Sequence, residues 1–239
     1  MTRQLSFDWP RDTAMGEGDF FVSGPNAEAR AQLDAPQAWP RGKLCLTGPK
    51  GCGKSHLAQI FAARHGATVL NTADLTPDTH RPEGPTVIED ADLLPQDCEE
   101  WLFHLHNALA LRAPLLLTAR TEPARWHIRL PDLASRMQAT TVARIGEPDE
   151  ALLAAIMVKL FTDRQIAPAP DLTDYLLPRI ERSYQAVQTI VSRLDRAGLA
   201  HGRPVTKQLA VDLLNHRLPT PSQARHVNVA GQEKRRRNA

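Results

Sequence analysis

The sequence has few cysteines, no long hydrophobic run and little excess charge, and each of these excludes a class of protein. Cys45, Cys52 and Cys98, the only three cysteines in 239 residues, have neither disulfide-framework nor metal-site spacing. No apolar run approaches transmembrane length, and the N-terminus lacks an apolar signal core. The net charge of +2 neither demands nor excludes nucleic acid. We therefore expect a cytoplasmic protein without a membrane partner, in a reducing compartment that keeps Cys52 as a thiol.

The composition is that of an ordinary chain with a core. Hydrophobic residues make up 42% of the sequence and charged residues 23%, so there is enough apolar material to bury. A length of 239 residues suits one large domain or two modest ones. Because composition leaves the function open, the function has to be sought in local motifs.

One eight-residue stretch fits the phosphate-binding pattern G-x-x-x-x-G-K-S/T. It consists of Gly48, Pro49, Lys50, Gly51, Cys52, Gly53, Lys54 and Ser55. The apolar run 44–47 before it predicts a strand, and the segment 56–64 after it, which has no Gly or Pro, predicts a helix. A chance match in a glycine-containing turn is the alternative. The order of strand, loop and helix favours a true P-loop.

The residue types in this P-loop suit a nucleotide. Glycines let successive backbone N–H groups point at one anion, and the N-terminus of the next helix adds partial positive charge. We expect Lys54 to contact the β- and γ-phosphates and Ser55 to bind Mg²⁺, with His56 at the end of the nucleotide-binding segment. The sequence therefore predicts a site for ATP or ADP with Mg²⁺.

A second motif follows at residues 86–92. A short apolar strand there ends in Glu89 and Asp90, which is the Walker B pattern when it lies downstream of a P-loop. The two acids are expected at the carboxyl edge of the sheet, where α/β folds bind ligands, and are candidate metal ligands. The alternative is a solvated turn after a strand.

Strands and helices alternate along the first two thirds of the chain. Further strands are predicted at 68–72, 114–120 and 140–145, and an amphipathic helix at 98–111, so we expect a parallel sheet. His104 and His106 are two apart on that helix and do not share a face, which favours packing or solvent-exposed residues over a metal pair. Helical patterns near 152–160, 172–180, 187–194 and 205–214 predict an all-α unit.

These patterns predict four segments. An N-terminal peptide (1–12) precedes an α/β nucleotide-binding domain (13–147), a helical lid domain (148–218) and a disordered tail (219–239). The tail ends in the basic run 234–237, which can touch DNA phosphates weakly or remain solvated. In the N-terminal peptide Leu5, Phe7 and Trp9 alternate with polar residues. It is therefore either a strand packed on its own domain or a linear peptide that docks on a partner.

The order of these motifs resembles an AAA+ ATPase: a P-loop, Walker B, a fourth strand with a polar end, a Ser-Arg pair and a helical lid. The segment 51–57 looks like the P-loop of the replication initiator DnaA, and 19–22 looks like its adenine-contacting segment, which would make Phe21 and Val22 nucleotide contacts. The resemblance implies an α/β AAA+ P-loop NTPase with a five-stranded parallel sheet, followed by a small all-α lid.

Two local matches narrow the resemblance to the regulatory inactivators of DnaA (the Hda type), which are DnaA-like modules without the DNA-binding domain. The N-terminal match looks like the family's sliding-clamp-binding motif and consists of Gln4, Leu5, Ser6, Phe7, Asp8 and Trp9. The segment 131–136 looks like its arginine-finger segment, which would make Arg136 the finger. A surface salt bridge is the alternative for Arg136.

The resemblance implies a negative regulator of replication initiation. Such a protein binds the sliding clamp (the β subunit of DNA polymerase III) and stimulates hydrolysis of the ATP bound to DnaA. An arginine finger supplied in trans neutralises charge that develops on the transferred phosphoryl group. DNA would be contacted only indirectly, or weakly through the tail, and self-association is left open.

The chain also departs from active AAA+ ATPases. These have Asp then Glu at the end of Walker B, whereas this chain has Glu89 then Asp90. The lid position that usually holds a sensor arginine aligns with Gln185, with Arg182 as a candidate replacement. Both departures predict slow hydrolysis by the protein itself, with a bound nucleotide, ADP in our expectation, that is structural.

Two other functions remain open at this point. One is a self-sufficient AAA+ ATPase such as a helicase loader, which would hydrolyse ATP briskly on its own. The other is a non-catalytic adaptor that recruits DnaA without using Arg136 in hydrolysis. The intrinsic rate of ATP hydrolysis distinguishes a self-sufficient ATPase from an inactivator of DnaA. A variant that binds DnaA but does not stimulate its ATP hydrolysis would exclude the adaptor.

Overall fold

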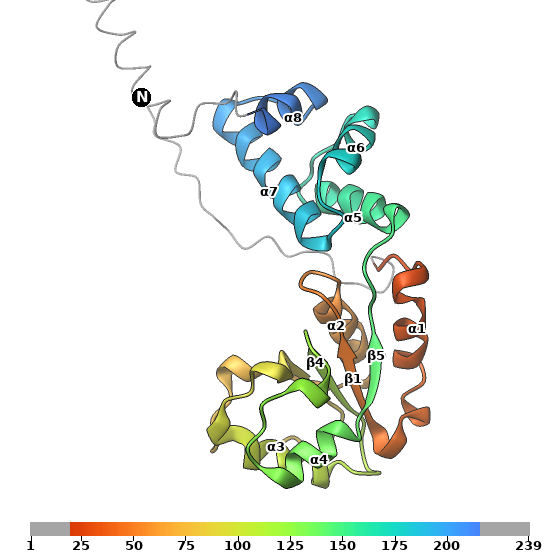
Figure 1. The fold of residues 1–239 in the computed structure, drawn as a ribbon, viewed down its shortest axis with the longest axis vertical. Helices are drawn as coiled ribbons and strands as arrows, with labels where there is room; N and C mark the ends of the chain where they lie inside the picture. Colours follow the sequence, from red (N-terminus) through yellow and green to blue (C-terminus); the bar gives the residue numbers. More distant parts are fainter. Residues whose placement is uncertain (1–19, 216–239) are drawn as a thin grey trace, which may run out of the picture. The chain divides into compact units, whose positions relative to one another are not determined.

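A five-stranded parallel sheet forms the centre of the first part of the computed structural model, which describes residues 20–215 (Figure 1). Its strands are β1 (Lys43–Thr47), β2 (Thr68–Asn71), β3 (Thr86–Glu89), β4 (Leu115–Ala119) and β5 (Thr141–Arg144), in the spatial order β2-β3-β4-β1-β5. The five-stranded parallel sheet predicted from the sequence is confirmed. The predicted N-terminal peptide 1–12 and tail 219–239 lie outside the described residues.

The inner strands β1 and β4 are apolar along most of their length because helices cover both faces of the sheet. Every residue of β1 and of β4 is buried. Strands covered on both sides have no solvent-facing row, so their sequences do not alternate. The edge strands β2 and β5 are only partly buried, as expected where one side of the strand has no neighbour.

Two helices pack on each face. The core on one face joins Cys45, Ile88 and Leu117 of the sheet to α3 (Glu99–Ala108) and α4 (Pro131–Gln138). The helices α1 (Gly24–Leu33) and α2 (Lys54–His65) contact the sheet from the other side (Figure 1). All five strands start together, since Lys43 and Thr86 each pair with Leu115, Leu44 pairs with Thr141, and Thr68 pairs with Thr86. The sheet therefore has one amino edge and one carboxyl edge.

A buried carboxylate ties α4 to α3. Glu99, the first residue of α3, is 6% exposed, and its two oxygens accept hydrogen bonds from the backbone N–H groups of Arg129 (3.0 Å) and Leu130 (2.7 Å). Leu130 is the residue before α4, so the carboxylate satisfies donors that the helix itself leaves unpaired. A negative group at a helix N-terminus is also favoured by the helix dipole.

The C-terminal part is helical. Its helices are α5 (Glu150–Asp163), α6 (Pro170–Leu176), α7 (Tyr184–His201) and α8 (Lys207–Leu214). Residues 156–181 and 186–215 form a compact unit of their own, whereas 20–155 and 182–185 group with the sheet. The core of the helical unit is built from Phe161, Leu172, Val191 and Leu209, each fully or almost fully buried. Among the described residues, no helix is both long and apolar enough to span a membrane.

We expect Glu99→Gln to lower the free energy of unfolding by about 1–3 kcal/mol, because an amide places its NH₂ group against backbone donors that the carboxylate satisfied. The measurement is urea unfolding followed by circular dichroism. Glu100→Gln is the matched control, since Glu100 is the next residue of α3 and is exposed. Equal stabilities for the two variants would show that the Glu99 contacts do not hold α4.

Candidate nucleotide-binding site

The predicted P-loop lies between the end of β1 and the start of α2, at the carboxyl edge of the sheet. Gly51 and Gly53 have φ values of 81° and 95°, in the left-handed region that suits glycine. Alternation of such residues with right-handed ones turns successive N–H groups toward one point, which makes an anion-binding concavity. Because α2 begins at Lys54, its unpaired N–H groups lie beside this concavity.

Gly48 is required by close packing. A Cβ atom at this position would lie 2.8 Å from the Cys52 Sγ atom and 2.9 Å from the carbonyl oxygen of Ile145. Either contact is shorter than real side-chain atoms tolerate. The P-loop is therefore pressed against the residue that follows β5, and its path is fixed by tertiary contact as well as by its own glycines.

The Lys54 side chain folds back over the P-loop. Its ammonium group donates to the carbonyl oxygens of Gly48 (2.8 Å) and Pro49 (3.0 Å) and lies 3.9 Å from the Cys52 Sγ atom. With 8% of the residue exposed, the cation is held against the loop instead of extending into solvent. A charged donor fixed here is well placed for phosphate oxygens, which form stronger hydrogen bonds with it than neutral carbonyls do.

Cys52 packs as a neutral side chain. The thiol is 3% exposed, and burial raises its pKa, although the nearby charge of Lys54 opposes this rise. A thiol with a raised pKa is protonated at neutral pH and is a poor nucleophile. Cys52 therefore contributes shape to the P-loop and not reactivity.

The acids of the Walker B segment lie at the same carboxyl edge. Glu89 ends β3, and β4 separates β3 from β1 in the sheet. Asp90 adopts a left-handed conformation (φ 52°, ψ 43°). Its N–H donates to the Thr118 Oγ1 atom of β4, and its carbonyl accepts from the Thr72 Oγ1 atom, each at 3.1 Å. Hydroxyl groups from two other segments thus hold a backbone conformation that aspartate adopts at some cost.

The residues present fit a Mg²⁺ ion held by few protein ligands. The Glu89 Oε1 atom is buried and accepts no hydrogen bond among residues 20–215, and a carboxylate oxygen without a donor suits a hard cation. Ser55 is exposed at the start of α2, so its hydroxyl is accessible. Within the described part of the chain no group of three or more His, Cys, Asp or Glu residues could hold a metal ion. A P-loop site does not need one, because substrate phosphates and water supply the other ligands.

Three polar residues that sequence analysis did not single out organise this edge. Thr72 and Thr118 hold Asp90, and the Asp92 Oδ2 atom accepts from the backbone N–H of Arg120 at 3.0 Å. The polar end of β4 was visible as a pattern in the sequence. The hydrogen-bond partners of Thr118 and Asp92 were not visible in the sequence, because each partner lies 28 residues away along the chain.

The segment before α1 reaches the P-loop through Phe20. The Phe20 ring meets the His56 ring edge-on at 5.4 Å between centroids, and a Cβ atom on Gly53 would lie 3.0 Å from it. Phe21 and Val22, the nucleotide contacts predicted in this segment, are 50% and 49% exposed, so their side chains are accessible. Residue 20, which the sequence did not single out, is the one that packs on the loop.

Near the start of α7, the residues that group with the sheet make two contacts. The Tyr184 hydroxyl donates to the Gly146 carbonyl (3.2 Å), and burial raises the pKa of this tyrosine. Arg182 forms an ion pair with Glu150 at 3.5 Å, but both side chains are largely exposed, at 77% and 68%. Such a pair is weak, so it does not prevent Arg182 from binding another anion. The assignment of the sensor position to Gln185 or Arg182 stays a prediction.

Arg136 lies at the opposite, amino edge of the sheet. It is in the last turn of α4, and its carbonyl accepts from the hydroxyl of Thr140, the residue before β5. The guanidinium carbon lies 5.0 Å from the centroid of the Phe103 ring. No carboxylate among residues 20–215 forms an ion pair with Arg136, so the predicted salt-bridge alternative is not seen there. Its Nε atom is buried without a hydrogen-bond partner in that part of the chain.

Other basic groups lie near Arg136. We call Arg41, Lys43, His106 and Arg136 the basic edge. Lys43 and His106 are 3% and 4% exposed, and neither the Lys43 Nζ atom nor the His106 Nδ1 atom has a partner among the described residues. Burial lowers the pKa of Lys43 to about 8 and that of His106 to about 4. The charges of Lys43, Arg136 and Arg41 act on His106 in the same direction, so the imidazole is neutral at neutral pH.

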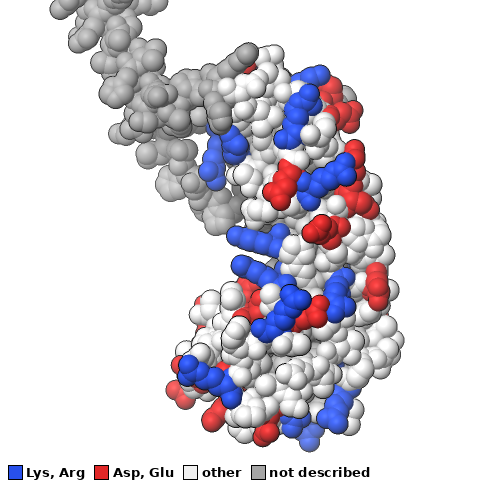
Figure 2. Space-filling view, in the orientation of Figure 1, with Lys and Arg blue, Asp and Glu red and all other residues white. Residues whose placement is uncertain are grey.

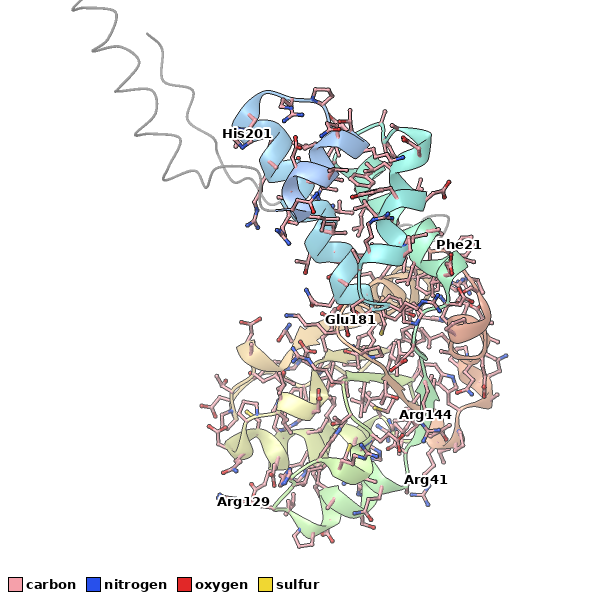
Figure 3. The ribbon with its side chains drawn as sticks, turned by 45° about the horizontal axis from the view of Figure 1, so that its top comes forward. Phe21, Arg41, Arg129, Arg144, Glu181 and His201 are labelled. Atoms are coloured by element: carbon pink, nitrogen blue, oxygen red, sulfur yellow. The ribbon has the colours of Figure 1, made fainter. Side chains whose placement is uncertain are left out.

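The two edges differ in what they present. Figure 3 shows Phe21 and Arg41 at opposite ends of the sheet-containing unit. On the face drawn in Figure 2, Lys and Arg side chains are interspersed with Asp and Glu, as expected from the small net charge.

No protein-family model matches the sequence. The fold is similar to domain III of the replication initiation protein DnaA from Thermotoga maritima, with a TM-score of 0.70 and 18% identity over 87% of this chain and 98% of that one. Thermotoga maritima RuvB has a TM-score of 0.60 and 13% identity, over 82% of this chain and 70% of that one. The replication initiator DnaA bound to AMPPCP and single-stranded DNA has a TM-score of 0.59 and 16% identity, over 76% of this chain and 65% of that one.

Identities of this size establish the fold and not the activity. The shared features are the parallel sheet with a P-loop at its carboxyl edge and the helices that follow it. The chain therefore has a DnaA-like AAA+ fold, which is an α/β P-loop NTPase sheet followed by a helical C-terminal part.

Proposed function

We propose that this protein is a negative regulator of replication initiation that stimulates hydrolysis of the ATP bound to DnaA. It would bind ADP or ATP with Mg²⁺ in its own P-loop and attach to the sliding clamp through residues 4–9, which lie outside the described residues. Arg136 would enter the nucleotide site of DnaA as an arginine finger. The observation that carries the proposal is an arginine without a carboxylate partner at the edge opposite the protein's own P-loop.

The position of Arg136 favours action in trans. The four steps from Lys43 to Thr47 along β1 separate the two sheet edges by about 13 Å, at ~3.3 Å per step. The guanidinium packs on Phe103 of α3, and Arg136 itself lies in the last turn of α4, which precedes the start of β5 at the amino edge. A nucleotide that Arg136 contacts would therefore belong to another molecule.

The chemistry favours arginine for this role. Charge builds up on the transferred phosphoryl group, and a cation placed there lowers the barrier by about 10³–10⁵-fold in rate in related enzymes. A planar, permanently charged fork suits phosphate oxygens better than an ammonium does. An arginine already neutralised by a carboxylate would lose ion-pair energy on moving to a phosphate, and Arg136 has no such ion pair among residues 20–215.

The bound nucleotide would have a structural role. Glu89 is the last residue of β3, and the Asp90 that follows it is held in a left-handed conformation by Thr72 and Thr118. The shorter aspartate would have to orient the attacking water, which we expect to make intrinsic turnover slow. The likeness to DnaA bound to AMPPCP supports nucleotide binding by this fold.

Lys54→Ala should abolish nucleotide binding, because it removes the cation held over the P-loop. A ligand that binds only the folded protein stabilises it by about 2.7 kcal/mol at a hundredfold excess over Kd. ADP should therefore raise the melting temperature of the parent and not that of the variant. Lys207→Ala, an exposed lysine of α8, is the control and should respond to ADP like the parent. Equal shifts for Lys54→Ala and the parent would contradict the P-loop assignment.

Arg136→Ala should leave clamp and nucleotide binding intact and lower stimulated hydrolysis by on the order of 10³-fold. The measurement uses ATP-loaded DnaA with a DNA-loaded clamp, with and without this protein. Arg136→Lys should rescue little, because a point charge lacks the fork geometry. Arg129→Ala is the control for loss of an exposed arginine next to α4 (Figure 3).

The Arg136 experiment also decides between this function and recruitment alone. A variant that binds DnaA but no longer stimulates hydrolysis excludes the adaptor. Parental stimulation by Arg136→Ala, or a defect confined to DnaA binding, would lead us to abandon the finger.

Replacing both Gln4 and Leu5 by alanine should weaken clamp binding and leave the melting temperature unchanged. A docked peptide owes most of its binding energy to a few anchors, so losing two of them should reduce affinity strongly. Surface plasmon resonance with immobilised clamp measures the affinity. If the double variant melts at a lower temperature, the segment packs on its own domain, and unchanged affinity would show that it is not the clamp motif.

A further inference from the structure

The turn before β1 places an arginine in a conformation that arginine disfavours. Arg41 has φ 54° and ψ 20°, in the left-handed region, and is exposed. Glycine would adopt this conformation without steric cost, because the cost comes from the Cβ atom. Among residues 20–215, no hydrogen bond or ion pair of the Arg41 side chain compensates for it. Unusual backbone conformations of this kind cluster at functional sites, which makes Arg41 a candidate for a role in binding.

The topology brings Arg41 and Arg136 to one edge. Arg41 lies two residues before Lys43, the first residue of β1. The start of β1 pairs with the start of β5, with Leu44 opposite Thr141. The hydroxyl of Thr140 in turn bonds to the Arg136 carbonyl, which fixes the last turn of α4 beside these two strand starts. The pairing of β1 with β5 and the Thr140–Arg136 hydrogen bond therefore place the two arginines at the same edge of the sheet, the amino edge.

The basic edge has cations and no counter-ion. Three of its polar atoms, Lys43 Nζ, His106 Nδ1 and Arg136 Nε, are buried and make no hydrogen bond within residues 20–215. In that part of the chain no carboxylate pairs with Lys43, Arg41 or Arg136. Like charges without an acid repel one another, and buried polar groups without partners are unfavourable. An anion bound between the exposed Arg41 and the partly exposed Arg136 would reduce the repulsion between their charges.

We propose that Arg41 is a second phosphate-binding cation, which acts with Arg136 on the nucleoside triphosphate held in the partner's P-loop. This inference rests on the proposed function, since it assumes that Arg136 meets a partner's nucleotide. A triphosphate matches the edge in charge and in its many acceptor oxygens, and two guanidinium groups can contact different oxygens. Arg136 stabilises the charge that develops on the phosphoryl group during its transfer. Arg41 contacts phosphate oxygens that are already charged in the bound nucleotide before transfer begins. Arg41 is therefore a binding residue that affects affinity more than maximal rate.

The decisive variant is Arg41→Gly. It removes the charge and relieves the backbone conformation at once, so the melting temperature should equal or exceed that of the parent. At low salt, we expect the concentration of this protein that gives half-maximal hydrolysis by ATP-loaded DnaA to rise about three- to fivefold. The maximal rate should stay within about twofold. The difference should shrink as salt is added, because exposed charges are screened.

Three further variants make the result specific. Arg41→Asn, which also tolerates the left-handed conformation, should behave like Arg41→Gly, and Arg41→Lys should largely restore the parental value. Arg129→Ala should match the parent, which controls for the loss of one exposed positive charge. Weaker binding of Arg41→Gly to DNA alone, with unchanged stimulation of DnaA, would overturn the proposal in favour of a nucleic-acid contact.

Arg136→Ala, measured in parallel, separates the two hypotheses. If Arg136→Ala stimulates hydrolysis like the parent, the arginine finger and this inference both fail. If Arg136→Ala is inactive and Arg41→Gly retains the parental half-maximal concentration at low salt, only the role of Arg41 fails. A rise for Arg41→Gly that persists unchanged at high salt would likewise refute it, because a charge contact of an exposed residue must weaken there.

Discussion

Parallel pairing of five strands is the constraint on which the rest of the structure depends. All strands point the same way and start in register. The residues directly after each strand therefore lie at the carboxyl edge, and the residues directly before each strand lie at the amino edge. The P-loop, Glu89 and Asp90 follow strands. Arg41 precedes β1, and Arg136 lies in the last turn of α4, the helix that leads into β5. One topological rule thus separates a nucleotide-binding edge from a basic edge.

At the carboxyl edge, tertiary packing determines the backbone path of the P-loop and of Asp90, which the sequence motifs alone do not. Gly48 has no room for a Cβ atom between Cys52 and Ile145, and Phe20 presses on Gly53 from the segment before α1. Thr72 and Thr118 hold the backbone of Asp90 from two other segments. These contacts make the site a product of the whole sheet-containing unit. A change in any of the contributing segments would therefore alter the P-loop or the neighbouring Asp90 backbone.

The basic edge depends on α3 as much as on α4. Glu99 binds the N-terminus of α4, and Phe103, one turn later on the same helix, lies under the Arg136 guanidinium. Residues four apart on a helix share a face, so α3 supports α4 at both of its ends. The cation is thereby positioned by backbone and aromatic contacts, and its charge is not neutralised by an acid among the described residues.

The sequence by itself determined the P-loop, the alternation of strands and helices and the helical C-terminal part, because these patterns lie in contiguous residues. Only the tertiary structure decided which residues support the site. The packing of Phe20 on His56 and Gly53 is one example, and the Thr118–Asp90 and Glu99–Arg129 contacts join residues 28 and 30 positions apart. Nor does sequence spacing reveal that Lys43, Arg136 and Arg41 lie close enough to His106 for their charges to lower its pKa. Such groupings arise from strand order, which local patterns do not encode.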